Sequence, residues 1–301
     1  MVAKALLNAV QNGKEVFVFI ETKARFDEEN NIKWGKVLEE NGANVAYSYP
    51  GIKVHSKILY IERTEDNASC AYGYISTGNF NEKTSKIYTD YGLMTSNSKI
   101  TKELKQVFQV LERTIIIPKS KRLLISPFTT RSTFRELIES EIETAKSGNE
   151  AYIILKMNSL QDPKMIKLLY KASNAGVKIR LLIRGICCLI PGIEGQSENI
   201  LITSIVDRFL EHGRLYIFGN NGKEKMYFGS ADWMTRNLDH RIEVITPVLD
   251  KSIQQQLREL LNLQLTDDVK SRVIDADQKN KYVKANSLKE SSQHNIYKAL
   301  L

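Results

Sequence analysis

One short pattern occurs twice in this chain, once in each half, and such a duplication restricts the fold to a tandem of similar units. His55 and Lys57 form an H-x-K step at the start of one apolar alternation, and His212 and Arg214 form an H-x-R step at the start of another. Each alternation predicts a strand. Two imidazoles with adjacent cations suit phosphoryl chemistry, in which one ring attacks phosphorus, the other handles a proton and the cations bind oxygens.

A longer repeat surrounds the two histidine steps. The second half opens with a strand, a helix and another strand over residues 151–184. The first half opens with a helix over 2–11 and a strand over 15–21, which match the later part of that order when Gly13 is aligned with Gly176. Nothing in the first half matches the opening strand of the second. We therefore expect the chain to begin inside a domain whose first strand lies outside this sequence; divergence of the first copy is the alternative.

The rest of the repeat alternates strands and helices. Equivalent strands are predicted over 71–75 and 225–228 and over 87–93 and 241–246, and helices are predicted over 28–41, 99–112 and 251–263. A capping box from Thr133 to Glu136 predicts the start of a helix that ends near Gly148. This alternation indicates α/β sheets. Two such sheets facing each other would bring His55 and His212 together.

Composition narrows the partners and the compartment. A net charge of +8 fits either an ordinary basic surface or a polyanionic partner: nucleic acid, a phosphate polymer or an anionic membrane. Three cysteines, two of them adjacent, make no disulfide framework and indicate an intracellular protein with buried thiols. The cysteine pattern gives no zinc site, and no apolar run approaches the roughly 20 residues that span a bilayer. Past residue 267 the sequence becomes polar, which predicts a solvated tail on the second copy, with helices over 267–275 and 288–300.

A set of motifs spread over almost the whole chain resembles the C-terminal half of bacterial polyphosphate kinases. They are ETKARFDEENN (21–31), VHSK (54–57), STGNFNEKT (76–84), IYTD (87–90), LIRGIC (182–187), SIVDRFLEH (204–212) and SADWMTRN (230–237). More distantly, the duplication and the paired histidines resemble the phospholipase D superfamily. The resemblance implies an α/β fold of tandem pseudo-symmetric phospholipase D-like domains, each a mixed sheet flanked by helices. The first domain would span residues 1–116, without its first strand, and the second residues 117–301, with a C-terminal helical tail.

The resemblance also implies roles for the two histidine steps. His55 would be the residue that becomes phosphorylated and passes the terminal phosphate of ATP to a growing polyphosphate. Lys57 would neutralise the phosphoryl oxygens. His212 would contact the nucleotide phosphate and supply a proton to the leaving group. Arg214 would be its neighbouring cation, and an arginine binds phosphate in a bidentate manner where a lysine acts as a point charge.

Five more positions complete the predicted site. Asn79 and Asp232 occupy equivalent loop positions of the repeat, where Asn79 could donate to a phosphoryl oxygen or orient a ring and Asp232 could orient a histidine or Arg214. Tyr88 and Arg184 match positions that contact ATP. Arg25 matches a position of the magnesium-phosphate site. Because an arginine has no lone pair to give a metal, we expect it to bind phosphate oxygens and Mg²⁺ to arrive with ATP.

Two alternatives remain beside a polyphosphate kinase. The phospholipase D pattern has an Asp where this chain has Glu62 in the first copy and Gly219 in the second; this departure argues against a phosphodiesterase or nuclease without removing that reading. The other alternative is a fragment that needs the N-terminal domains of the family for activity. The resemblance further implies ATP, ADP and inorganic polyphosphate as partners, no nucleic acid, a homo-oligomer in the full-length protein, and a cytoplasmic location, with peripheral association with the inner membrane left open.

Overall fold

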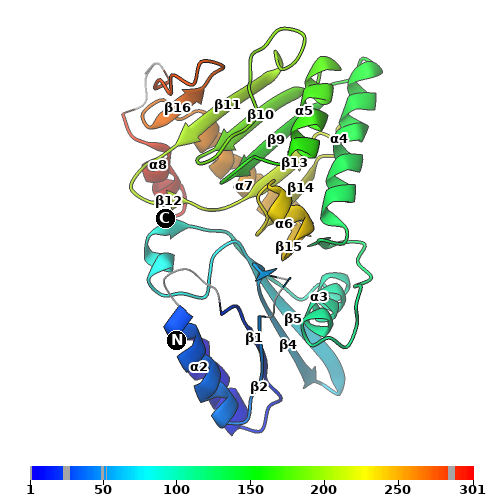
Figure 1. Cartoon of the computed structure of the whole chain (residues 1–301), viewed down its shortest axis with the longest axis vertical. Coiled ribbons are helices and arrows are strands. Elements are labelled where there is room, and N and C mark those ends of the chain that lie inside the picture. Colours follow the sequence, from blue (N-terminus) through cyan, green and yellow to red (C-terminus); the bar gives the residue numbers. More distant parts are fainter. Residues whose placement is uncertain (1, 23–27, 49–50, 52, 284–288) are drawn as a thin grey trace.

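The computed structural model of the chain describes residues 2–22, 28–48, 51, 53–283 and 289–301. The first half contains α1 (Val2–Gln11), β1 (Phe17–Ile20), α2 (Glu28–Glu40), β2 (Asn44–Tyr47), β3 (Lys53–Val54), β4 (Lys57–Glu65), β5 (Ala68–Ser76), the 3₁₀ helix η1 (Thr84–Lys86), β6 (Tyr88–Thr89), β7 (Gly92–Thr95) and α3 (Ser98–Leu111). The predicted order of helices and strands is therefore present, and Figure 1 shows this half below the other along the long axis.

The second half is built around the larger sheet. Its elements are β8 (Leu124–Ser126), α4 (Thr130–Lys146), β9 (Tyr152–Met157), α5 (Pro163–Asn174), β10 (Lys178–Ile183), β11 (Ile200–Ile205), β12 (Leu210–Glu211), β13 (Leu215–Phe218), β14 (Lys225–Gly229), α6 (Thr235–Asp239), β15 (Arg241–Pro247), α7 (Lys251–Leu265), β16 (Ser271–Ile274) and α8 (Ser292–Ala299). The predicted α/β fold of two similar halves is confirmed.

The large sheet explains the apolar runs of the second half. Its strand order is β16-β11-β10-β9-β13-β14-β15-β3, with β8 paired to β15. Helices α4 and α5 cover one face and α7 the other (Figure 1). On β10, Leu181 and Ile183 join the core cluster on the α4 and α5 side, whereas Leu182 joins the cluster that contains Leu261 of α7. Because both faces are covered, the strand is apolar at successive positions instead of alternating with polar residues.

The strands of the first half form two small sheets. β1 and β2 are parallel, and β4, β5 and β7 form an antiparallel sheet. Leu104 and Val107 of α3 pack with Ile75 of β5 in a core that also contains Ile125 of β8 and Val244 of β15. The two halves therefore share one of their hydrophobic cores, which holds them in a defined relative position because such cores are close-packed.

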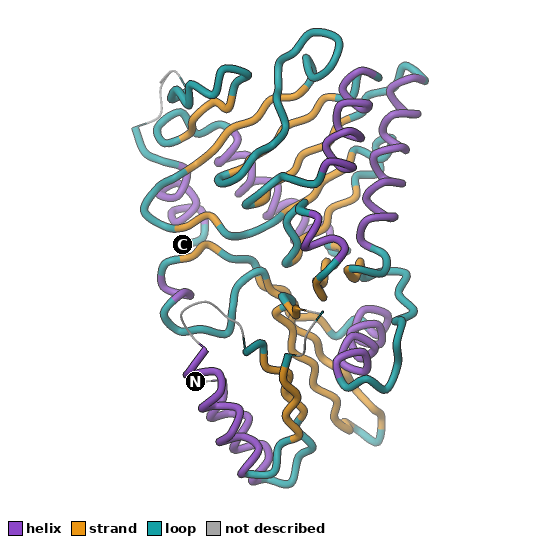
Figure 2. The backbone as a smooth tube through the Cα atoms, in the orientation of Figure 1, coloured by secondary structure: helices purple, strands orange, loops and turns teal. Residues whose placement is uncertain are grey.

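Strands of the two halves pair with each other at two places. β3 of the first half pairs with β15 of the second, and β12 of the second pairs with β6 of the first. These two-residue strands lie at the junction of the halves, where much of the backbone is loop (Figure 2). In both cases a short strand that ends directly before a histidine pairs with the opposite half, and we call this the exchange of β3 and β12. β3 thereby joins the large sheet, whereas β12 and β6 form a two-stranded sheet of their own.

Some predicted details are wrong. The tail is not only helical, because residues 271–274 form β16, which pairs antiparallel with β11 at the sheet edge. It is also partly buried, since Asp267 accepts the backbone N–H of Ser292 at 2.6 Å and both residues are buried. Helix α4 starts at Thr130, ahead of the expected capping box. The thiols are not buried, because Cys188 is exposed and Cys70 and Cys187 are half-buried.

No helix within the described ranges combines the length and the apolar character needed to cross a bilayer. The longest helix of the second half, α4, carries charged residues along its sequence, including Arg135, Glu136 and Glu139.

Candidate functional site

Both histidines are fixed by backbone pairing with the opposite half. The carbonyl of Ile242 on β15 accepts the N–H of His55 at 2.9 Å, and the carbonyl of Thr89 on β6 accepts the N–H of His212 at 3.1 Å. Each histidine therefore lies in the break between a two-residue strand and a longer one. The sequence predicted one continuous strand, and the break is the difference that lets each ring approach the other half.

The next residue along each accepting strand supplies a carboxylate to the ring. Glu243 Oε2 lies 2.9 Å from His55 Nδ1, and Asp90 Oδ1 lies 2.7 Å from His212 Nδ1. Because an ionised carboxylate only accepts hydrogen bonds, it selects the tautomer with the proton on Nδ1. The lone pair of each neutral ring is then on Nε2. Each half thus orients the histidine of the other.

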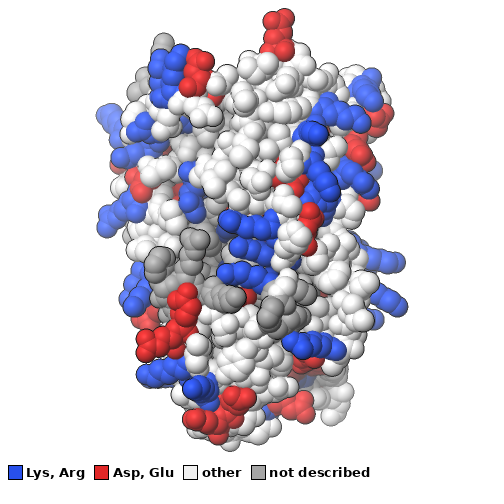
Figure 3. Space-filling model, in the orientation of Figure 1, with Lys and Arg blue, Asp and Glu red and all other residues white. Residues whose placement is uncertain are grey.

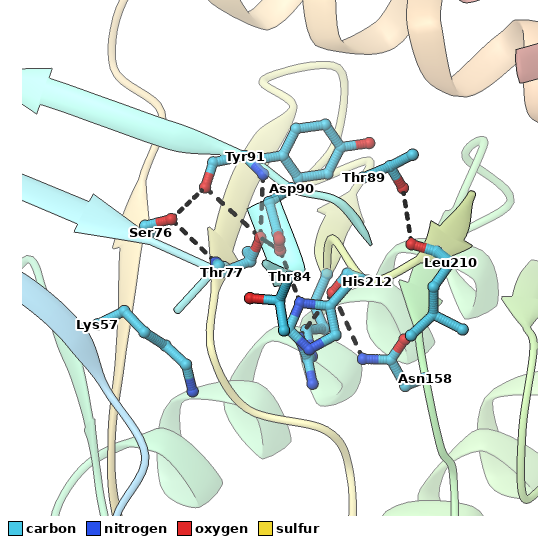
Figure 4. Close-up of polar contacts among 12 residues, drawn as sticks. Lys57, Ser76, Thr77, Thr84, Thr89, Asp90, Tyr91, Asn158, Leu210 and His212 are labelled. Atoms are coloured by element: carbon cyan, nitrogen blue, oxygen red, sulfur yellow. Dashed lines mark hydrogen bonds and ion pairs between the residues drawn. The ribbon is translucent and has the colours of Figure 1, made fainter. Parts of the chain in front are cut away.

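The two carboxylates are held in similar ways. Ser230 and Asn237 donate to Glu243, the latter from Nδ2 to Oε1 at 2.6 Å. Thr77 Oγ1 donates to Asp90 Oδ1 at 2.6 Å. Thr77 and Ser230 belong to the equivalent small-residue loops of the repeat, so the same loop position supports the carboxylate in both halves. Figure 4 shows Thr77, Asp90 and His212 in this chain of contacts.

Burial and neighbouring charges keep both rings neutral. Burial lowers the pKa of His55 to about 4; Lys57 and Arg214 act in the same direction, whereas Glu243 opposes them. Burial also lowers the pKa of His212, and Arg214 and Lys57 add to this effect while Asp90 opposes it. The charges of Lys57 and Arg214 therefore act on both imidazoles, which indicates that the rings border one site. A neutral imidazole is the nucleophilic form.

The low pKa of His55 predicts a dependence on pH with a definite sign. Its pKa falls from the ordinary 6.5 to about 4 in the folded chain, so between these values the unfolded chain binds a proton that the folded chain does not. The contribution of His55 to stability should therefore be fully present above pH 6.5 and be lost as the pH falls toward 4. Imidazole NMR spectra recorded across this window, assigned with His55→Ala, should show a neutral His55 ring until the acid end. Protonation of this ring near pH 6.5 would contradict the prediction.

The two cations lie beside the two histidines. Lys57 donates to the backbone carbonyl of His55, and Arg214 Nη1 donates to the carbonyl of His212 at 2.6 Å. Both cations are buried. Arg214 Nη2 also lies 3.3 Å from Asp232 Oδ2, so the predicted pairing of these two residues is present. In Figure 3, Lys and Arg side chains gather across the middle of the displayed face, between the halves.

Lys57 is poised to change its charge near neutral pH. Burial lowers its pKa to about 7; Arg214 and Arg241 lower it as well, while Glu243 and Asp90 raise it. Neither Lys57 nor Arg241 has an ion-pair partner among the residues that the structure describes. A bound anion would supply the missing countercharge.

Of the remaining predicted residues, two lie beside His212 and two do not have a described contact with the histidines. The ring centroid of Tyr88 lies 4.9 Å from that of His212. Arg184 donates from Nε to the carbonyl of Glu211, directly before His212. Asn79 is exposed and makes no side-chain hydrogen bond within the described ranges. Arg25 lies outside the described residues.

Three residues of the site were missed by sequence reasoning, namely Asp90, Glu243 and Arg241. A signal for the first two exists, because they stand at equivalent positions in the last strand of each copy, in IYTD and RIE respectively. Reading the repeat one residue at a time would have paired them. The exchange of β3 and β12 has no such signal, because two residues are too few to show a period.

The fold and the site together define a class of duplicated α/β proteins in which each half contributes one histidine to a shared site. Family models described as polyphosphate kinase C-terminal domain 1 and C-terminal domain 2 match residues 1–116 and 123–294. The chain belongs to the polyphosphate kinase family.

Similar proteins extend beyond this chain. The polyphosphate kinase of Vibrio parahaemolyticus is 50% identical over 294 residues, which cover 97% of this chain and 42% of that protein. The polyphosphate kinase of Escherichia coli K12 is 46% identical, with 97% and 43% covered. The crystal structure of polyphosphate kinase from Porphyromonas gingivalis superposes with a TM-score of 0.91 at 41% identity, covering 99% of this chain and 46% of that one. The chain thus spans less than half the length of the curated relatives that it matches.

Proposed function

We propose that this chain carries the phosphoryl-transfer site of an enzyme that moves the terminal phosphate of ATP to inorganic polyphosphate through a phosphohistidine. The observation that carries the proposal is the pair formed by His55 and Glu243. The carboxylate holds the Nδ1 proton at 2.9 Å, and burial keeps the ring neutral. The nucleophilic Nε2 lone pair is then ready at neutral pH without prior loss of a proton. Membership of the family supports the choice of substrates.

The proposed transfer takes two balanced steps. In the first, His55 Nε2 forms a bond to the γ-phosphorus of ATP while the bond from that phosphorus to the β–γ bridging oxygen breaks, which releases ADP. In the second, a terminal oxygen of polyphosphate attacks the phosphohistidine, and the P–N bond breaks to return neutral His55. The polymer is then one phosphate longer. The same steps in reverse make ATP from ADP.

The other residues would stabilise charge and position the nucleotide. Lys57 and Arg214 would bind phosphoryl oxygens, on which negative charge is spread in the transition state. His212, whose Nδ1 proton is held by Asp90, would take up a proton on Nε2 and pass it to the leaving oxygen. Tyr88 lies against the His212 ring and would face the nucleotide.

Four further predicted residues complete the proposed site. Arg184 would bind ATP phosphates beside Glu211. Asp232 would keep Arg214 in place, as their contact suggests. Asn79, whose side chain is exposed, would donate to a phosphoryl oxygen. Arg25 would bind the phosphates that accompany the metal.

The described residues do not themselves fit a protein-held metal site. No group of three or more His, Cys, Asp or Glu side chains placed to hold a metal ion occurs among them. We therefore propose that Mg²⁺ enters as a complex with ATP, whose phosphates supply most of its ligands. The chain's own cations, Lys57 and Arg214, would neutralise the remaining charge.

Incubation with ATP labelled at the γ-phosphate tests the proposal. We expect acid-labile label on the chain and its transfer to polyphosphate. The alternative of a phosphodiesterase or nuclease predicts no label from ATP and cleavage of a phosphodiester substrate instead. The alternative of an incomplete fragment predicts label only when the N-terminal part of a polyphosphate kinase is added. Absence of label under both conditions would contradict the proposed function.

A further inference from the structure

The segment that leads to His212 is hydrogen-bonded along both of its edges. One edge of β12 pairs with β6. At the other, the side-chain amide of Gln293 on α8 accepts the N–H of Phe209 at 2.9 Å and donates to the carbonyl of Phe209 at 2.8 Å. A carboxamide has the donor and acceptor of a peptide group. Gln293 thus substitutes for a neighbouring strand, and the C-terminal helix becomes part of the wall behind the site.

The same amide also reaches the residue directly before His212. Glu211 is buried, and its carboxylate is surrounded by donors from four other elements. Oε2 accepts from Lys156 Nζ at 2.7 Å, Gln264 Nε2 at 2.8 Å and Thr89 Oγ1 at 3.1 Å, and Oε1 accepts from Gln293 Nε2 at 2.7 Å. A carboxylate offers about four acceptor sites, so the set of partners is complete. Strands β6 and β9 and helices α7 and α8 converge on this one group.

The Glu211 carboxylate needs its hydrogen-bond donors for an energetic reason. Burial raises the pKa of Glu211, but Lys156 and the hydrogen bonds of Gln293 and Thr89 bring it below its ordinary value. The group is therefore charged, and a buried charge persists only while its partners remain in place. Removal of one donor would leave a lone pair without a partner, and β12 could move to find water.

The described part of the first half contains no equivalent carboxylate junction. Val54 stands before His55 where Glu211 stands before His212. The backbone N–H of Val54 is instead held by the Glu21 carboxylate at 3.0 Å. Among the described residues, a buried carboxylate junction of this kind therefore supports only the strand that leads to His212.

We propose that Gln293 is a positioning residue for His212, acting through Phe209 and Glu211, so that helix α8 sets the placement of the second histidine. The inference rests on the proposed function for its catalytic consequence. The contact between His212 Nδ1 and Asp90 thus depends on Gln293, a side chain near the C-terminus.

The test compares two amide-to-leucine substitutions on the same helix. Gln293→Leu removes the grip on Phe209 and Glu211, whereas Asn295→Leu removes only a bond to the backbone carbonyl of Glu290. Nitrogen-detected NMR of the imidazoles reports the Nδ1 proton of His212, and a chain with four histidines gives few signals to assign. We expect Gln293→Leu to accelerate solvent exchange of that proton about tenfold. The Nδ1 proton of His55 should not change in either variant.

Kinetics provide the second readout. In phosphoryl transfer from ATP, Gln293→Leu should lower kcat roughly tenfold to a hundredfold with little change in KM, because the nucleotide still binds while the second histidine is misplaced. If this variant does not fold, Gln264→Leu, which removes a different donor to Glu211, should move the His212 signal in the same direction.

Several outcomes would overturn the inference. The first is a Gln293→Leu variant that has a lower thermal stability but an unchanged exchange rate of the His212 Nδ1 proton. The second is a folded Gln264→Leu variant in which that exchange rate is also unchanged. The third is an equal change of that exchange rate in Gln293→Leu and Asn295→Leu. The NMR result is independent of enzyme activity. Absence of phosphoryl transfer in the wild type would therefore count against the proposed function and leave the positioning of His212 to be decided by the spectra.

Discussion

Replacing His55 with alanine should abolish incorporation of the labelled γ-phosphate into the chain. Nε2 of this ring is the proposed attacking atom, and an alanine offers no substitute nucleophile. We expect the rate of transfer to fall by a factor on the order of 10⁴ or more, the scale seen when a covalent catalyst loses its nucleophile. The measurement is acid-labile label on the protein after a single turnover, together with polyphosphate formed at steady state.

Two other histidine substitutions make this result specific. His240→Ala changes an exposed ring at the end of α6 and should leave the label unchanged. His212→Ala should slow labelling without removing the acceptor, because it takes away a group that assists proton transfer and not the attacking atom. Label that persists on His55→Ala would place the nucleophile elsewhere, and label lost equally from all three variants would indicate a folding defect.

The sequence predicted the local parts of the site but not the contacts between residues that are far apart in the chain. The repeated spacing of His55 with Lys57 and of His212 with Arg214 marked these residues as candidates, and the structure places each cation beside its histidine. Residues two apart share a face only within a continuous strand, and the strand is interrupted between β3 and β4. The partner of His55, Glu243, is 188 positions away, and no local pattern connects them.

The C-terminal tail contains a strand that the sequence did not predict. Residues 271–274 (SRVI) are followed by polar residues, and so short a segment gives no clear period. They become a strand because the edge of β11 offers unpaired backbone groups, which β16 satisfies by antiparallel pairing. Tertiary context decides such segments. By contrast, helix α5 has Asp162 as its N-cap and Pro163 in its first turn, as these residue types predict.

The exchange of short strands also makes the position of each histidine depend on how the two halves are docked. His55 depends on β15 of the second half for its backbone and carboxylate contacts, and His212 depends on β6 of the first half for the same contacts. Any shift of one half against the other would therefore disturb both rings together. A site of this kind works only when the halves are docked, which is consistent with the hydrophobic core that they share.

Replacing Glu243 with glutamine should reduce phosphorylation of His55 by a factor of roughly 10²–10⁴, although the nucleophile itself is intact. The carboxylate accepts from His55 Nδ1 and from Asn237 and Ser230. With Asn237 donating to the amide oxygen, the amide NH₂ of glutamine would face Nδ1 and donate to it. The ring proton would then move to Nε2 and block the attacking lone pair.

The same substitution should also change the pH profile. Glu243 raises the pKa of Lys57, which is about 7 in the wild type, so its loss should lower that pKa. Lys57 is charged below its pKa and neutral above it, and the alkaline limb of activity should move to lower pH. Glu62→Gln provides the control, since that exposed glutamate pairs with Lys105 on the surface.

The rate of phosphohistidine formation against pH, combined with ¹⁵N NMR of the His55 tautomer, measures both effects of Glu243→Gln. A labelling rate and a tautomer that both match the wild type would show that Glu243 does not orient His55. A slow rate with the wild-type tautomer would assign the loss to Lys57 instead, and the shift of the alkaline limb would then account for the whole effect. A change of tautomer with a slow rate at every pH is the expected result, because the ring must present its Nε2 lone pair before any cation can assist the transfer.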